Sequence, residues 1–332
     1  MIERVIDPVS PDLIEAELTD DHLLRYTNKA GNHIYVIDAH TAPNTMREIG
    51  RLREIAFRSG GGGTGKECDI DEFDTMPQPC HQLLVWNPER RDIVGAYRYL
   101  PGSEMRRDEQ GNLNIAMAHM FRFSQQFIDE YLPCTIELGR SFVSLDYQST
   151  RAGSKAIYAL DNLWDGLGAL TVIHPEIKYF FGKMTMYPSY NRECRDLLLE
   201  FLRTYFPDPE ALVTPLEPLN GVLSQPGALA GNDFGADYKR LNSFVRAHGI
   251  NIPPLVNAYM SLSPTMRVFG TAVNPEFGNV EETGIFIKIE EIAENKRSRH
   301  IDTFKAALRQ NLNSFKQRLA RRFLKLDIMR NS

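Results

Sequence analysis

A regular alternation of strand-like and helix-like segments constrains the fold of this chain more than any other feature. Apolar and β-branched runs predict four strands, at Leu83–Trp86, Ile93–Leu100, Thr135–Leu145 and Tyr179–Met186. Apolar residues spaced three and four positions apart predict helices at Met46–Arg58, Arg151–Ile173 and Asn191–Tyr205. This alternation is typical of an α/β fold in which helices flank a central sheet.

The segments outside this region predict a less regular arrangement. Residues 106–112 indicate a polar hairpin tip or flexible loop, and residues 207–235 indicate a linker or long surface loop. The other predicted elements are a short helix at His119–Phe127, a helix at Asp237–His248, strands at Met266–Ala272 and Gly284–Ile289, and a long helix at Ser298–Leu326. We therefore expect a core over residues 1–206, a C-terminal α+β extension over 207–295 that completes the site, and a basic amphipathic helix over 296–332.

Length, hydropathy and cysteine content exclude several classes of protein. A chain of 332 residues fits one large domain, or a domain with an extension. The chain contains no apolar run of about 18 residues that would predict a transmembrane helix. Its acidic start lacks the apolar core of a signal peptide. The four cysteines form no CxxC pair, zinc-ligand pattern or disulfide framework, so we expect reduced thiols, a cytoplasmic location and no bound metal.

The net charge of −5 hides a strong asymmetry. From Lys296 onward there are eleven Lys and Arg residues against two acids, a charge of +9 that leaves −14 on the rest of the chain. Over residues 298–326, apolar positions also recur with helical spacing. This pattern fits either a helix packed on the body with a solvated face, or one that docks on an anionic lipid surface with about 1 kcal/mol per basic residue. Nucleic acid is disfavoured because the body is acidic and carries no binding motif.

Three short patterns imitate known functional motifs. Gly60–Lys66 fits GxxxxGK, but Glu67 replaces the Ser or Thr that holds magnesium and the run follows a helix, so a flexible loop is the simpler interpretation. His33 and Asp38 have the H-x4-D spacing of glycerolipid acyltransferases, but an odd offset on a strand places them on opposite faces. None of the cysteines has a histidine partner in a nucleophile motif, which favours buried or neutral thiols.

Four short motifs follow one another along the first half of the chain. They are Arg53-Glu-Ile-Ala-Phe57, Asp71-Glu-Phe-Asp74, Arg98-Tyr-Leu-Pro101 and Glu137-Leu-Gly-Arg140-Ser-Phe-Val143. Each is weak alone. Together, and in this order, they resemble the acyl-homoserine-lactone synthases and their relatives, the ornithine- and glycine-lipid N-acyltransferases, which are often labelled haemolysin-like.

The second half extends the resemblance to the amino-lipid enzymes over roughly residues 30–290. The matching segments are Leu163–Ala169, Tyr179–Met186, Pro253–Tyr259 and Thr271–Phe277. Homoserine-lactone synthases are shorter and lack this region, and a tryptophan that they carry after the first arginine is replaced here by the Gly60–Gly65 loop. A lactone synthase that uses S-adenosylmethionine is therefore the alternative enzyme, and a membrane-active haemolysin is the non-enzymatic alternative.

The resemblance implies a GNAT fold and an N-acyltransferase. Such an enzyme would move a (3-hydroxy) fatty acyl group from acyl carrier protein, or from acyl-CoA as a second donor, to the α-amine of an amino acid of the ornithine or glycine type. It implies no tightly bound cofactor. The partners would be acyl carrier protein, which is acidic in these families and could bind the basic helix, and the amino acid. If residues 298–326 bind lipid, the enzyme would be peripheral on the inner face of the membrane.

Glu137 and Arg140 are the candidate catalytic residues within this resemblance. An amine is mostly protonated at pH 7, so its attack on a thioester needs a base, and Glu137 acting through a water would supply about 10²–10⁴-fold. Arg140 lies three residues further on, so on a regular strand it faces away from Glu137. The family fold places a bulge in this strand, which would re-aim one of the two. Without a bulge, one of them is structural.

Further residues are assigned to the substrates. Arg53, Phe57, Asp71, Asp74 and Arg98 are candidate substrate-binding residues. The two aspartates would hold the substrate ammonium group or order the substrate loop through the arginines, and a structural Asp–Arg network away from the substrate is the alternative.

The donor thioester is expected where two strands separate. In the GNAT fold the strands at 135–145 and 179–186 would splay apart and expose N–H groups that polarise the thioester carbonyl. The pantetheine phosphate would lie at the start of the following helix, where amides and dipole favour an anion. Gln148, Arg151, Gly153 and Ser154 form an imperfect copy of the GNAT pyrophosphate loop, with Arg151 in place of the first glycine. An ordinary helix start is the alternative.

Overall fold

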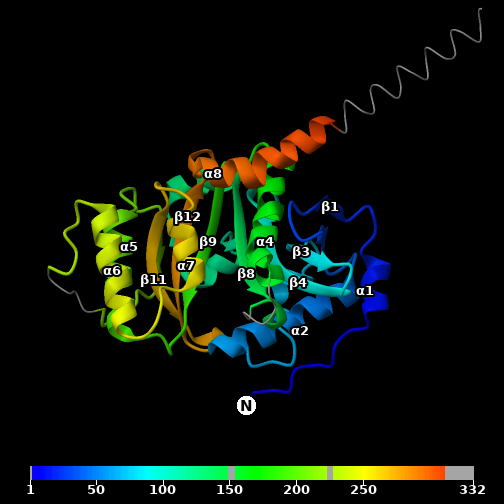
Figure 1. The fold of residues 1–332 in the computed structure, drawn as a ribbon, viewed down its shortest axis with the longest axis horizontal. Helices are drawn as coiled ribbons and strands as arrows, with labels where there is room; N and C mark the ends of the chain where they lie inside the picture. The colour runs from blue at the N-terminus through cyan, green and yellow to red at the C-terminus, as the bar shows by residue number, and fades with distance from the viewer. Residues whose placement is uncertain (1, 149–153, 223–226, 311–332) are drawn as a thin grey trace, which may run out of the picture.

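A single mixed sheet organises the protein (Figure 1). The structure is a computed structural model that describes residues 2–148, 154–222 and 227–310. Eight strands are hydrogen-bonded in the order β1-β2-β3-β4-β8-β9-β12-β11, and the β8–β9 pair is parallel. Helices cover both faces of the sheet. The predicted α/β class, a GNAT-like mixed sheet flanked by helices, is confirmed.

The strands of the main sheet include all six that the sequence predicts. They are β1 (Leu23–Tyr26), β2 (His33–Ile37), β3 (His81–Asn87), β4 (Asp92–Pro101), β8 (Thr135–Val143), β9 (Tyr179–Met186), β11 (Arg267–Asn274) and β12 (Val280–Lys288). The last two come from residues 207–295, and β12 pairs with β9 along its whole length. This part of the chain therefore extends the same sheet beyond β9.

Two groups of helices cover the two faces. On one face, α4 (Ser154–Ile173), α5 (Arg192–Tyr205), α6 (Phe234–Ala247) and α7 (Pro254–Met260) share an apolar core with the sheet. On the other face, α1 (Pro11–Glu17) and α2 (Pro43–Gly60) pack on β2, β3 and β4. The short α3 (Glu72–Thr75) belongs to a third, largely aromatic cluster on this second face, beneath β9, β11 and β12.

Local sequence signals set the helix ends. Helix α2 begins with Pro43, whose missing N–H costs nothing in a first turn. It ends at Gly61, which adopts φ 95°, a left-handed conformation that favours glycine. The Asn191 side chain accepts a hydrogen bond from the Cys194 N–H and caps α5, and Asp233 caps α6 in the same way. These caps satisfy backbone groups that would otherwise lack partners at the helix ends.

The helix predicted at His119–Phe127 is wrong. Its centre is the strand β7 (Phe121–Phe123), which pairs antiparallel with β10 (Val213–Pro215). In β7 the two aromatic side chains alternate with the exposed Arg122, so a period of two fits the segment better than a helical period. The partner β10 lies inside the predicted linker at 207–235, so part of that linker is ordered by strand pairing. The polar tip at 106–112 is a hairpin of β5 (Arg106–Arg107) and β6 (Leu113–Asn114).

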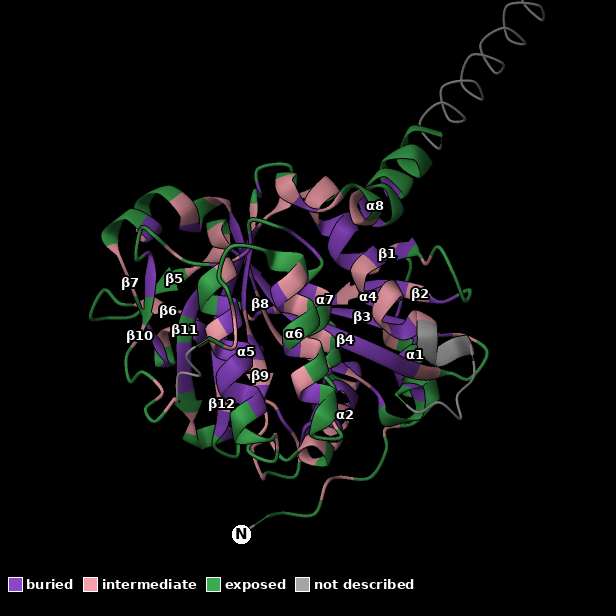
Figure 2. Ribbon diagram, turned by 60° about the vertical axis from the view of Figure 1, so that its left-hand side comes forward, coloured by how far each residue is buried: buried purple, intermediate pink, exposed green. Residues whose placement is uncertain are grey.

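The chain returns to α4 after the sheet. After the short helix α8 (Glu294–Arg297), a π-helical turn at Ser298–Asp302 packs on α4, and His300, Ile301 and Phe304 are buried. A Cβ at Gly168 of α4 would lie 2.4 Å from the His300 carbonyl oxygen, so glycine permits this close approach. Residues 305–310 continue as an exposed helix (Figure 2). The rest of the helix predicted at 298–326 lies outside the described residues. No described helix is long and apolar enough to cross a membrane.

Candidate active site

The centre of the sheet opens between β8 and β9. The two strands pair at only three positions, the last being Glu137 with Phe181. Beyond that point β8 stays paired with β4 as far as Val143, while β9 stays paired with β12 as far as Met186. The two halves of the sheet therefore diverge, as the resemblance implied.

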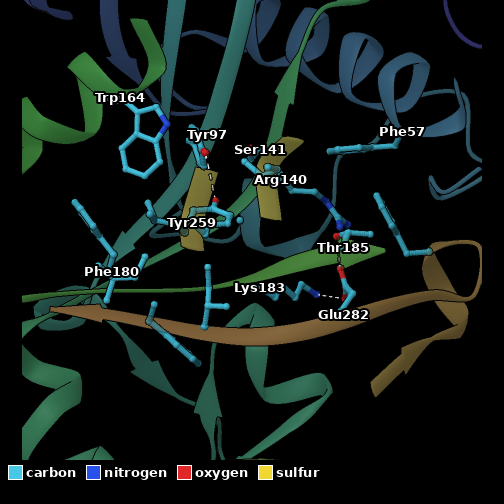
Figure 3. Close-up of a pocket in the computed structure, with 18 residues that line it drawn as sticks. Phe57, Tyr97, Arg140, Ser141, Trp164, Phe180, Lys183, Thr185, Tyr259 and Glu282 are labelled. Carbon is cyan, nitrogen blue, oxygen red and sulfur yellow. Dashed lines mark hydrogen bonds and ion pairs between the residues drawn. The ribbon is translucent and has the colours of Figure 1, made fainter. Parts of the chain in front are cut away.

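Two cavities meet at this opening. The narrower, of about 70 Å³, is lined by Tyr97, Trp164 and Tyr259 on the α4 face of the sheet (Figure 3). The wider, of about 790 Å³, lies on the α2 face and is bordered by Asp71, Arg98 and Glu137. Arg140 and Lys183 line both. The narrower cavity thus has several aromatic walls, and the wider one is bordered by the ionic side chains of Asp71, Arg98 and Glu137.

A β-bulge in β8 brings the two catalytic candidates to one face. Arg98 pairs with Gly139 and Ala96 with Phe142, so two residues of β8 oppose Tyr97 alone. Arg140 has φ 48°, a left-handed conformation unusual for a residue with a side chain. The bulge shifts the alternation of side chains between the two faces of β8 by one residue. Arg140 therefore lines the wider cavity together with Glu137. The bulge that the resemblance implied is present.

Arg53 anchors a buried ionic network beneath this cavity. It extends from α2 with no exposed surface, and its guanidinium lies 3.1 Å from the Asp74 carboxylate. The same guanidinium donates to the Gln82 side-chain oxygen, and the Gln82 amide donates in turn to Asp74 at 2.9 Å. Because all three side chains are fully buried, Arg53 cannot contact a substrate in this arrangement. Its place is that of a support.

Asp71 connects this support to the cavity. Its carboxylate caps α3 by accepting from the Phe73 N–H, while Asp74 accepts from the Asp71 N–H. Arg98 lies 2.5 Å from Asp71 and 3.3 Å from Asp74, and Arg140 lies 3.3 Å from Asp71. The sequence left two roles open for Asp71, a contact with the substrate or a place in a structural Asp–Arg network. The structure is compatible with both, because Asp71 belongs to the network and also borders the cavity.

Asp69, which the sequence reasoning did not single out, completes the network. It is fully buried, and one of its carboxylate oxygens lies 3.1 Å from Arg140 Nε. Burial raises the pKa of Asp69, and the attraction of Arg140, Arg53 and Arg98 only partly offsets it. Burial would also raise the pKa of Asp71, but Arg98 with Arg140 and Arg53 outweighs it and holds that pKa well below its usual range.

Glu137 is a buried carboxyl group at the edge of the wider cavity. One of its carboxylate oxygens accepts a hydrogen bond from the Met117 N–H at 2.8 Å. Burial raises the pKa of Glu137, and this N–H together with the attraction of Arg98 and Lys183 only partly opposes the rise. A carboxylate with a raised pKa is suited to accept a proton near neutral pH.

Phe57 and the residues of the predicted phosphate loop lie in different parts of the structure. Phe57 contacts Phe277 edge-on, with ring centroids 5.0 Å apart, and lines the narrower cavity. The Gln148 side-chain amide donates to the Val143 carbonyl at the end of β8. Arg151 and Gly153 lie outside the described residues, and Ser154 is the first residue of α4.

The glycine-rich run after α2 does not offer its amides to a phosphate. Glu54, with no exposed side-chain surface, accepts hydrogen bonds from the N–H groups of Thr64 and Gly65 at 3.0 and 2.7 Å. It also accepts from the Thr64 hydroxyl at 2.8 Å. The donors at this turn of the loop are therefore taken by an internal carboxylate, in agreement with the rejection of the GxxxxGK pattern.

The other two imitated motifs are equally structural. His33 lies in β2 and contacts Tyr26 and Tyr35, and the Asp38 carboxylate accepts from the N–H groups of His40 and Thr41 after the strand ends. Burial raises the pKa of the Cys80 thiol to about 12 and that of Cys68 to about 11. Thiols with such pKa values are protonated at neutral pH and poorly nucleophilic.

Lys183 and Glu282 are site residues that the sequence reasoning missed. Lys183 extends from β9 and Glu282 from β12, and they form an ion pair inside the sheet opening (Figure 3). The available signal was a lone lysine within the apolar strand Tyr179–Met186. Its partner is 99 residues away and could not be inferred from local pattern.

A parallel strand pair that separates at a buried carboxyl group, a bulge in β8 and two cavities that share Arg140 and Lys183 are the arrangement expected of a GNAT-type N-acyltransferase. Sequence comparison agrees, since residues 52–157 match the family model described as acetyltransferase (GNAT) domain.

Two relatives cover nearly the whole chain. A protein of Bacteroides thetaiotaomicron named glycine N(alpha)-acyltransferase is 63% identical over 306 residues, which is 91% of each chain. A protein of the same name from Phocaeicola vulgatus is 60% identical over 306 residues, 91% of this chain and 94% of its own. The protein belongs to the family of these N-acyltransferases. FeeM, an N-acyl amino acid synthase from uncultured soil microbes, has a solved structure that is 10% identical, with a TM-score of 0.37 over 78% of this chain and 92% of its own.

Proposed function

We propose that this enzyme transfers a fatty acyl group from acyl carrier protein to the α-amine of glycine. The observation that carries the proposal is the position of Glu137, a buried carboxyl group of raised pKa where β8 and β9 separate. The two relatives named glycine N(alpha)-acyltransferase support glycine as the acceptor. Trp164, Leu255 and Ile287 give the narrower cavity apolar walls, which suit the first carbons of an acyl chain next to the thioester.

The proposed reaction is the aminolysis of a thioester. The amine nitrogen of glycine attacks the thioester carbonyl carbon, the C–N bond forms and the C–S bond breaks. Glu137, through a water, accepts the proton that the attacking nitrogen loses. The leaving thiolate takes up a proton and departs as the free thiol of the donor. Backbone N–H groups along the separated strands would stabilise the negative charge on the carbonyl oxygen.

The polar residues around the wider cavity have different roles in this proposal. Arg140, held by Asp69 and Asp71 with its guanidinium carbon 4.6 Å from the centre of the Phe277 ring, borders the space where the amine would approach. Arg98 and Asp74 keep Asp71 in place. Gln148, five residues beyond the end of β8, would receive the pantetheine phosphate together with Arg151, Gly153 and Ser154, a role proposed from the motif alone.

Reconstituted acyl transfer tests this proposal directly. The full chain is incubated with acyl-acyl carrier protein or acyl-CoA and with glycine, ornithine or alanine, and products are identified by mass spectrometry. We expect N-acylglycine as the main product and a higher kcat/KM with the carrier-protein donor. N-acylornithine as the main product would refute the acceptor, and equal kcat/KM with acyl-CoA would refute the donor. No acylated amine with any pair would refute the function.

Membrane docking is proposed for the basic C-terminal segment. Residues 311–332 carry six Lys and Arg residues against one acid. They follow the exposed helix at 305–310, which continues from the buried turn at His300. We expect a chain that ends at Gln310 to keep the buried Ile301 and Phe304, to fold normally, and to lose most of its binding to vesicles containing anionic lipid. Vesicle co-sedimentation at low and high salt measures this, and unchanged binding by the truncated chain would exclude the lipid role.

A further inference from the structure

Lys183 is the only charged residue of β9, and it points into the opening between β8 and β9 (Figure 3). Its side chain is 16% exposed and its amino group pairs with the Glu282 carboxylate on β12. Glu282 is almost fully buried and also accepts from the Asn274 side-chain amide at 2.9 Å. The ion pair is therefore held in place from two strands.

The ammonium group of Lys183 has hydrogen-bonding capacity left over. A lysine ammonium carries three donors. One is used by Glu282, and the other contact described for it is the Met120 sulfur at 3.6 Å, a weak acceptor. Since Lys183 also lines the wider cavity, an anionic group there would be within reach of a strong, charge-assisted donor.

The arginines in and beneath the cavity are each paired with carboxylates of the buried network. Arg53, Arg98 and Arg140 are each ion-paired within the network formed by Asp69, Asp71 and Asp74, so three cations face three anions. Lys183 and Glu282 likewise balance each other. Glu137 is left as the inner carboxyl group without an ion-pair partner among the described residues. The cavity thus presents an acceptor for an ammonium group at Glu137 and a spare donor for a carboxylate at Lys183.

Glu137 and Lys183 lie on neighbouring strands and line the same cavity. Glu137 pairs with Phe181, and Lys183 lies two positions further along β9 and lines the same cavity. Two residues along a strand and one strand across correspond to about 8 Å between the Cα atoms, before any splay. The two residues therefore border one part of the wider cavity from neighbouring strands.

We propose that Lys183, held by Glu282, binds the α-carboxylate of the acceptor amino acid and so places its amine beside Glu137. This role rests on the proposed function and adds to it the chemical class that the acceptor must have, an amine carrying an adjacent carboxylate. Amines that lack the carboxylate are discriminated against at Lys183. Asn274 contributes indirectly, by orienting Glu282.

Glycinamide tests the role, because it keeps the amine of glycine and removes the negative charge. We expect wild-type kcat/KM to favour glycine over glycinamide. In Lys183→Met the ratio of the two values should fall by about 10- to 100-fold, mainly through a higher KM for glycine, because one charge-assisted hydrogen bond to the carboxylate is lost. Lys183→Arg should keep most of the ratio. Lys288→Met is the matched control, since Lys288 is paired with Glu291 near the surface, outside both cavities.

A second variant separates recognition from folding. Lys183→Met leaves Glu282 buried without its cation, so Lys183→Met/Glu282→Gln, which removes both charges, is measured beside it. A fall in the glycine-to-glycinamide ratio in either folded variant supports the role. An unchanged ratio in both, or a wild-type enzyme that does not prefer glycine, overturns it. Wild-type enzyme that acylates neither amine refutes the proposed function itself, and the role of Lys183 with it.

Discussion

Glu137→Gln is expected to lower kcat/KM for acyl transfer by about 10²–10⁴-fold, the usual contribution of a general base. Glutamine has the same shape and can still accept from the Met117 N–H, so the local structure should persist. It cannot take up the proton of the attacking amine. The rate is followed by the release of the donor thiol, and folding by circular dichroism.

The control for this variant is Glu104→Gln. Glu104 is 41% exposed and paired with His81, outside both cavities, so its loss should leave the rate near that of the wild type. A Glu137→Gln enzyme with near-normal turnover would show that Glu137 is not the base.

The raised pKa of Glu137 also predicts how activity and stability depend on pH. Burial is the main cause of the raised pKa. The base works when deprotonated, so kcat/KM should rise as pH increases through this pKa, and the rise should disappear in Glu137→Gln. For stability the sign is opposite, because the folded state holds the proton more tightly than the unfolded state. That contribution is complete below the unfolded pKa and is lost as pH rises through the folded pKa, so at neutral pH the glutamine variant should melt no lower than the wild type.

Arg53→Met is expected to lower the free energy of unfolding by about 3–5 kcal/mol, the usual cost of removing one partner of a buried ion pair. Arg53 has no exposed surface, and its loss leaves the buried Asp74 and Gln82 short of a donor. Arg98 would remain beside Asp74 at 3.3 Å, but it is also bound to Asp71. Chemical denaturation measures the change.

Arg4→Met provides the comparison for Arg53. Arg4 pairs with Asp7, and both side chains are more than four-fifths exposed, so no measurable change in stability is expected. Equal denaturation midpoints for Arg53→Met and the wild type would show that the network does not hold the α2 side of the cavity together.

Elements with strong periodicity could be predicted from the sequence, and elements defined by distant partners could not. The strands β3, β4, β8 and β9 and the helix α5 lie where their apolar patterns predicted. β7 was mistaken for a helix because its three residues are ordered by pairing with β10, about 90 residues away. A short segment contains too few residues to show its own period.

Site residues that belong to a sequence motif could be proposed from the sequence. Residues that reach the site only through tertiary contacts could not. Glu137, Arg140, Asp71 and Arg98, which come from three of the four motifs, line one cavity, and their roles in substrate binding and catalysis stay predictions. The face on which Arg140 lies depends on a bulge that the residue offsets alone argued against. Lys183 and Glu282 meet only because β9 pairs with β12, a contact that no local pattern encodes.

The three-residue junction between β8 and β9 has a consequence for recombining such enzymes. The β8 side of the opening, with Glu137 and Arg140, lies within residues 52–157, which match the GNAT family model. Lys183, Trp164 and Tyr259, which also line the opening, come from later in the chain. If Glu137 and Lys183 act as proposed, a chimaera with a single crossover within α4 is expected to combine the proton acceptor of one parent with the carboxylate-binding lysine of another.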